Sequence, residues 1–116
     1  MSTIELRDGG VVVRLTWAER ILSASRDVAA GRHHIAGVRE TPRALDEVTG
    51  LRSPGLGLPG HAMIGTWRRF GADAGRDFVV VRGRGHGVVI ELVDHTYDRF
   101  VLSVEDPSEV RTGLGR

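Results

Sequence analysis

The sequence predicts a mainly β domain of the α+β class: an antiparallel barrel or sandwich of about seven strands, with one helix after the first hairpin and a short C-terminal helix. Short segments that alternate apolar and polar residues at a period of two predict the strands. The connections between the later segments are too short to contain crossover helices, which argues against a doubly wound parallel sheet. A chain of 116 residues has the length of one domain, so residues 1–116 are expected to form a single unit.

The N-terminal part predicts a hairpin and then a helix. The hairpin follows from TIELR, DGG and VVVRLT, where Asp8 and Gly9 suit the positive φ angles of a tight turn. Thr16 and Glu19 then have the spacing of a capping box, which predicts a helix that starts at residue 17 and ends between residues 25 and 30. The weaker apolar pattern that follows, over residues 32–41, predicts two short strands or one broken strand.

The second half predicts a loop, a meander and a terminal helix. Residues 42–60 are predicted to be the longest irregular stretch, because three prolines and four glycines leave room for one helical turn at most, at ALDEV. Four strands of a meander are then predicted, at HAMIGTWRRF, DFVVVRG, GVVIELVD and RFVLSVE. In DPSEV, Asp106 suits the N-cap, Pro107 the first position and Glu109 the third position of a short C-terminal helix.

The charge of the whole chain points to no particular class of partner. The net charge is +1, all 16 basic residues are arginines, and cysteine is absent. This gives no strong nucleic-acid signal. Charge is uneven along the chain, with five arginines between residues 68 and 84 and six acids between residues 91 and 109, so we expect a bipolar surface. The lack of a long apolar run or a signal-like start predicts a soluble, cytoplasmic protein.

The segment GLGLPG places Gly55, Gly57 and Gly60 at the G-x-G-x-x-G spacing of a dinucleotide-binding turn. Such a turn follows a strand and opens a helix, whereas the residues after GLGLPG predict another strand. We therefore interpret this segment, together with Arg52 and His61, as a surface loop rather than a nucleotide site.

The histidines and serines predict neither a metal centre nor a catalytic site. The five histidines are His33, His34, His61, His86 and His95. Adjacent histidines on a strand point to opposite faces, so the first two cannot easily bind one ion. No serine lies in a G-x-S-x-G nucleophile elbow. We therefore expect no catalytic residue, no metal and no cofactor.

Arginines near two turns predict a basic edge. The segment RGRGHG alternates glycine with basic side chains that suit phosphate or carboxylate, and the preceding hairpin adds further arginines. The candidate anion-binding or partner-binding residues are Arg68, Arg69, Arg76, Arg82, Arg84 and His86. The alternative is a solvated hairpin whose charges serve solubility.

Several segments between Leu51 and Pro107 carry a family resemblance: GLRSPGLGLPG before AMIGTW, then GRDFVVV, GVVIELVD and YDRFVLSVEDP, with RLTWAERILSA earlier. In these segments the chain resembles a group of small actinobacterial proteins with a pleckstrin-homology-like (PH-like) fold. The resemblance implies two antiparallel sheets, a C-terminal helix that caps one end, and a role in binding phosphoinositides, peptides or proteins. Lipid-binding members carry clustered basic residues in the first hairpin, whereas this turn is flanked by Arg7 and Arg14 alone. That departure argues against phosphoinositide recognition there.

Three functions are compatible with these patterns. The first is a non-catalytic protein-binding or scaffold module that recognises a protein segment or forms a homodimer. The second is an anion or membrane-surface binder that uses the arginines named above. The third is a small enzyme or ligand carrier in which residues 50–60 form a lid over His61 or His86.

Overall fold

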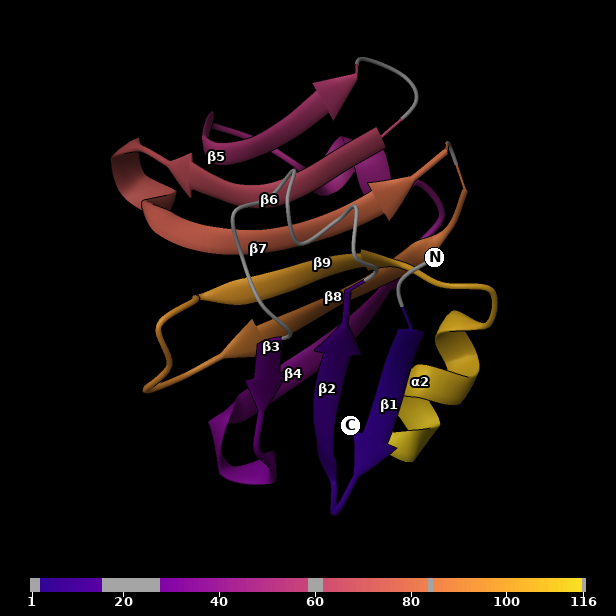
Figure 1. Cartoon of the computed structure of the whole chain (residues 1–116). Coiled ribbons are helices and arrows are strands. Elements are labelled where there is room, and N and C mark those ends of the chain that lie inside the picture. The colour runs from indigo at the N-terminus through magenta and orange to yellow at the C-terminus, as the bar shows by residue number, and fades with distance from the viewer. Residues whose placement is uncertain (1–2, 16–27, 59–61, 84, 116) are drawn as a thin grey trace.

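The computed structural model describes residues 3–15, 28–58, 62–83 and 85–115, and these form two β-sheets and one C-terminal α-helix (Figure 1). The smaller sheet contains β1 (Thr3–Arg7), β2 (Gly10–Arg14) and β3 (Val28–Ala30), all antiparallel. The β1–β2 turn confirms the predicted hairpin, because Asp8 and Gly9 have φ angles of 51° and 79°.

The larger sheet has six strands in the order β4-β8-β9-β7-β6-β5. Its strands are β4 (Ile35–Thr41), β5 (Leu51–Leu58), β6 (Ala62–Arg69), β7 (Gly75–Arg82), β8 (Gly87–Leu92) and β9 (Arg99–Ser103). The nine strands of the described residues exceed the predicted seven, and they form two separate sheets rather than a closed barrel.

The predicted meander is wrong at β9. This strand lies between β8 and β7, antiparallel to the first and parallel to the second, so β7 and β8 do not pair. Phe100, Val101 and Leu102 are all buried, which means that β9 is covered on both faces. A meander would have left this apolar strand beside one neighbour only, whereas the observed order places it in the interior of the sheet. The parallel pair also departs from the purely antiparallel sheets that the PH-like resemblance implies.

The prediction of an irregular stretch over residues 42–60 is wrong for its second part. A 3-10 helix, η2 (Ala44–Glu47), forms the predicted single turn. After it, β5 pairs with β6 along the edge of the sheet. The register shifts between Arg52 and Gly55, so Pro54 lies at an irregularity of an edge strand, where the missing N–H is tolerated.

The chain before β4 differs in part from the prediction. The helix predicted to start at residue 17 and to end between residues 25 and 30 lies mostly in residues 16–27, outside the described residues. Val28–Ala30 form strand β3, which was not predicted. A 3-10 helix, η1 (Arg32–His34), follows it. The broken strand expected over residues 32–41 becomes β4, whose register shifts between Ile35 and Gly37.

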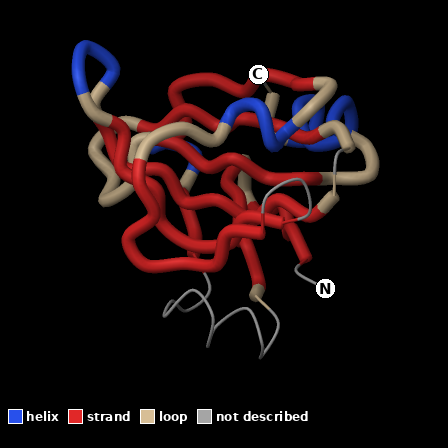
Figure 2. Tube along the Cα trace, turned by 90° about the horizontal axis from the view of Figure 1, so that it is seen from above, coloured by secondary structure: helices blue, strands red, loops and turns tan. Residues whose placement is uncertain are grey.

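The core has two parts because strand residues alternate between the faces of the larger sheet. One face packs against the smaller sheet through side chains that include Val11, Phe78 and Phe100. The other face buries Trp67, together with Ala44 of η2 and valines of β7, β8 and β9. Figure 2 shows the strands as stacked layers, with helical turns at the margins.

The C-terminal helix α2 (Pro107–Gly113) has the predicted start. Asp106 accepts a hydrogen bond from the Glu109 N–H at 3.1 Å, and Pro107 occupies the first turn. Val110 and Leu114 join the core, so α2 lies against one side of the two sheets. In the described part of the chain, no helix has both the length and the apolar character needed to cross a bilayer.

Candidate functional site

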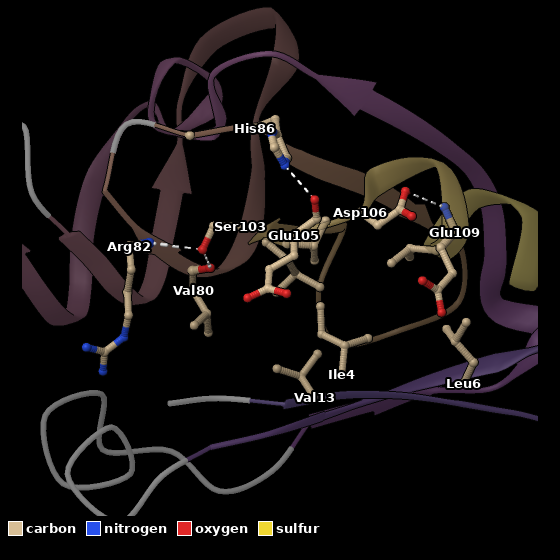
Figure 3. Close-up of a pocket in the computed structure, with 14 residues that line it drawn as sticks. Ile4, Leu6, Val13, Val80, Arg82, His86, Ser103, Glu105, Asp106 and Glu109 are labelled. Carbon is tan, nitrogen blue, oxygen red and sulfur yellow. Dashed lines mark hydrogen bonds between the residues drawn. The ribbon is translucent and has the colours of Figure 1, made fainter.

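A groove of about 660 Å³ opens beside α2, between β1 of the smaller sheet and the ends of β7 and β9 (Figure 3). Apolar side chains line most of it. Among the described residues these are Ile4, Leu6, Val13, Val80, Leu102, Val104 and Val110. Leu6 is 38% exposed although it is a large apolar residue, so the groove presents apolar surface to solvent. Exposed apolar surface in a concave site is typical of a binding site.

One wall of the groove is acidic. Glu105 and Asp106 follow β9, and Glu109 lies in the first turn of α2. The Asp106 carboxylate caps the helix, whereas the Glu105 and Glu109 carboxylates have no partner among the described residues. The wall therefore carries uncompensated negative charge beside an apolar floor.

The predicted residues Arg82 and His86 also line the groove. The His86 Nε2 lies 2.7 Å from the backbone oxygen of Glu105 and donates to it, which ties the β7–β8 connection to the acidic wall. Ser103 is also placed here. Its Oγ accepts a hydrogen bond from the Arg82 N–H at 3.0 Å and donates to the Val80 oxygen at 3.4 Å, so backbone groups use both of its hydrogen-bonding roles.

The structure divides the predicted basic residues between two places. Arg68 and Arg69 end β6 and Arg76 begins β7, whereas Arg82 ends β7. A strand rises about 3.3 Å per residue, so the two groups lie about 20 Å apart. Arg84 falls outside the described residues. The single basic edge expected from the sequence therefore becomes a basic hairpin at one end of β7 and the groove at the other.

Arg69 is not a free surface charge, because it belongs to a buried ionic cluster. Asp77 is completely buried and receives the Nε–H groups of Arg69 at 3.0 Å and of Arg99 at 2.7 Å. Arg99 also donates to the backbone oxygen of Glu47 in η2 at 2.7 Å. A hydrogen bond from Arg39 holds the pKa of the Glu47 carboxyl below its ordinary value. This cluster fixes β6, β7, β9 and η2 relative to one another.

The predicted glycine loop is part of a sheet. Gly55 and Gly57 lie in β5 and pair with Gly65 and Met63 of β6, and Arg52 pairs with Trp67. Gly60 and His61 fall outside the described residues. A lid built on residues 50–60 would have to break the hydrogen bonds between β5 and β6. β5 is also the edge strand of the larger sheet that lies farthest from β4 and β8.

Two histidines join the smaller sheet and η1 to the end of the larger sheet. His34 Nδ1 lies 3.0 Å from the Val93 oxygen, and His95 Nε2 lies 2.8 Å from the Ala29 oxygen of β3. The rings of His34 and His95 meet edge to face with centroids 5.6 Å apart. No group of three or more metal-ligating side chains occurs within the ranges given above.

The hydrogen bonds of His95 favour the tautomer with its proton on Nε2. Its Nδ1 accepts the Tyr97 N–H at 3.0 Å, and its Nε2 faces a carbonyl that can only accept. Long-range ¹H–¹⁵N NMR at neutral pH should show an unprotonated Nδ1 and a protonated Nε2. Averaged shifts, typical of a freely exchanging imidazole, would contradict this geometry.

Sequence patterns did not identify the main residues of the groove. Leu6 and Val104 appeared only as strand residues, and Glu105 and Glu109 only as members of an acidic stretch and a helix cap. Their juxtaposition depends on how α2 and β1 pack, which is tertiary information. The burial of Asp77 could have been suspected from the sequence, because this acid directly precedes the apolar run of a strand and buried acids are usually paired.

No known protein family model, no curated protein and no solved structure matches this chain.

Proposed function

We propose that this protein is a non-catalytic binding module that holds a short peptide segment of a partner protein in the groove beside α2. The segment would carry apolar side chains followed by lysine or arginine. One observation carries the proposal: an apolar groove of about 660 Å³ has a wall in which Glu105 and Glu109 lack cationic partners among the described residues. Burial of apolar surface provides affinity, and charge complementarity selects the partner.

The composition of the groove favours a peptide over a small acidic ligand. An anion would lie close to the acidic wall, whereas a basic side chain placed there gains two charge-assisted hydrogen bonds. The groove opens to solvent rather than forming an enclosed cavity, which suits a segment of a partner protein. The filled hydrogen-bonding roles of Ser103 support a role in binding rather than in nucleophilic catalysis.

The PH-like resemblance is part of this proposal. It is supported by the related sequence segments and by a C-terminal helix that closes one side of the two sheets. The parallel pairing of β7 and β9 argues against a PH-like fold, because the resemblance implies antiparallel sheets. Modules of that fold include peptide-binding ones, which supports a binding role for this chain by analogy of fold alone.

Selection from a random peptide library displayed on phage tests the proposal. Peptides enriched by the wild-type protein are expected to share two apolar residues close to lysine or arginine. The double variant E105Q/E109Q should bind the enriched peptides about tenfold more weakly, because it loses two charge-assisted contacts. The control E91Q removes an exposed carboxylate of β8 that does not line the groove, and should bind as the wild type does.

Two results would overturn the peptide proposal. One is the absence of any enriched motif. The other is an enriched peptide that binds wild type and E105Q/E109Q equally well. Concentration-dependent dimerisation that E105Q/E109Q abolishes, with no peptide enriched, would instead assign the groove to a second copy of the chain.

A further inference from the structure

The hairpin formed by β6, the 3-10 helix η3 (Gly71–Asp73) and β7 ends on the side of the molecule opposite α2. Figures 1 and 2 both show η3 projecting at this corner. A second pocket, of about 280 Å³, lies at its base and is lined by Arg68, Arg69, Phe70, Gly75, Arg76 and Asp98. This pocket does not share any lining residue with the groove.

Two arginines face each other across this hairpin. Arg68 and Arg76 are directly opposite in the β6–β7 register, so their Cβ atoms are about 5 Å apart on the same face of the sheet. Like charges in such a position are destabilising unless something neutralises them. Neither guanidinium has an ion pair or side-chain hydrogen bond with another described residue.

The nearby acids whose side chains the structure describes, Asp77 and Asp98, are already engaged. Asp77 lies on the other face of the sheet and binds Arg69 and Arg99. Asp98 accepts the backbone N–H of Arg76 at 2.7 Å, so its carboxylate holds the strand rather than the Arg76 guanidinium. Although Asp98 reduces the local positive potential, the Arg68 and Arg76 guanidinium groups lie on the same face of the sheet and neither is paired with a carboxylate among the described side chains.

An exposed aromatic residue completes the site. Phe70 directly follows β6 and is 66% exposed, the highest exposure among the large apolar side chains of the described residues. It lines the same pocket as the two arginines. A large apolar side chain in this setting is costly to leave in water and suits a ligand with an apolar part beside an anionic part.

We propose that Arg68 and Arg76 form a site for a phosphate group, and that Phe70 contacts the apolar part of the molecule that carries it. Two guanidinium groups on neighbouring strands can each donate two hydrogen bonds to phosphate oxygens, which neutralises the cross-strand repulsion. The phosphate is either that of a small soluble ester or that of a lipid headgroup at a bilayer surface. Both sources present the same chemistry to the arginines and differ in what they present to Phe70.

Titration with sodium phosphate at constant ionic strength tests the arginine pair, with the backbone and arginine Nε signals followed by NMR. Saturable shifts are expected at β6, β7 and η3, and R68Q and R76Q should each weaken binding about tenfold. The matched control is R32Q, because Arg32 is an exposed arginine of η1 that lies outside this pocket. Equal weakening in all three variants, or no saturable shift, would overturn the proposal.

Vesicle sedimentation identifies the source of the phosphate. If the site binds a bilayer, the wild type should sediment with vesicles that contain about 30% phosphatidylglycerol. R68Q, R76Q and F70S should each reduce the bound fraction severalfold. F70S should leave the affinity for inorganic phosphate unchanged, because it keeps both arginines. If the wild type shows the phosphate response but does not sediment with vesicles, the site takes soluble phosphate esters. Failure of peptide selection at the groove leaves both readouts intact, because the two sites lie at opposite ends of β7.

Discussion

Replacement of Asp77 by alanine is expected to lower the free energy of unfolding by about 3 kcal/mol. The change removes the carboxylate that pairs with both Arg69 and Arg99, and it takes this buried negative charge away from two largely buried guanidinium groups. Their side chains are 17% and 14% exposed, so water reaches them in part and the loss lies at the low end of the range for a broken buried pair. Urea unfolding followed by circular dichroism measures it.

The Asp77 prediction has a matched surface control. D46A removes a carboxylate that pairs with Arg43 at 3.4 Å where both side chains are more than half exposed, and it should change stability by less than about 0.5 kcal/mol. D77N keeps the size of the side chain and one hydrogen-bond acceptor, so its loss of stability should lie between those of D77A and D46A. Equal small losses in D77A and D46A would show that the buried cluster does not hold the strands together.

Replacement of Phe100 by alanine is expected to destabilise the fold by about 3–5 kcal/mol. Phe100 is the second residue of β9, is completely buried and packs against Phe78 and Tyr97, each with a ring centroid 6.2 Å away. Truncation opens a cavity between the two sheets that β9, bonded on both sides, cannot close. Domains of this size have only about 5–15 kcal/mol of total stability, so the thermal midpoint should fall steeply.

Two variants define the specificity of the Phe100 result. F100L conserves most of the volume and should cost about 1 kcal/mol. F70A truncates an aromatic residue that is 66% exposed, and it should leave stability within about 0.5 kcal/mol of wild type. Comparable losses of stability in F100A and F70A would contradict the assignment of the core. A stable F70A would show that position 70 can be substituted in the vesicle test without unfolding the protein.

Local patterns predicted the elements whose cause is local. Asp8-Gly9 specifies a two-residue turn through its backbone angles, and Asp106 specifies the start of α2 through one hydrogen bond. Residues 62–69 are a strand as expected, which removes the helix that a dinucleotide-binding turn would need. In each case the deciding interaction lies within a few residues of sequence.

Properties that depend on distant pairing were not predicted. Pro54 and the glycines of residues 51–58 suggest a loop on propensity alone, yet β6 offers them a partner and they become an edge strand. The position of β9 follows from burial on both faces, which the run FVLSV indicates but does not connect to β7. For the sites, the sequence singled out the arginines as candidates, whereas the register that sets Arg68 against Arg76 and the burial of Asp77 depend on the pairing of distant strands.

The parallel contact between β7 and β9 has a consequence for synthesis of the protein in the cell. On the ribosome, β7 and β8 emerge first and cannot complete their hydrogen bonds until residue 103 has left the exit tunnel. During that interval two valine-rich strands expose unpaired backbone edges, which are templates for aggregation. A nascent chain that terminates early, before residue 99, would keep those edges permanently and should become a client of chaperones and proteases.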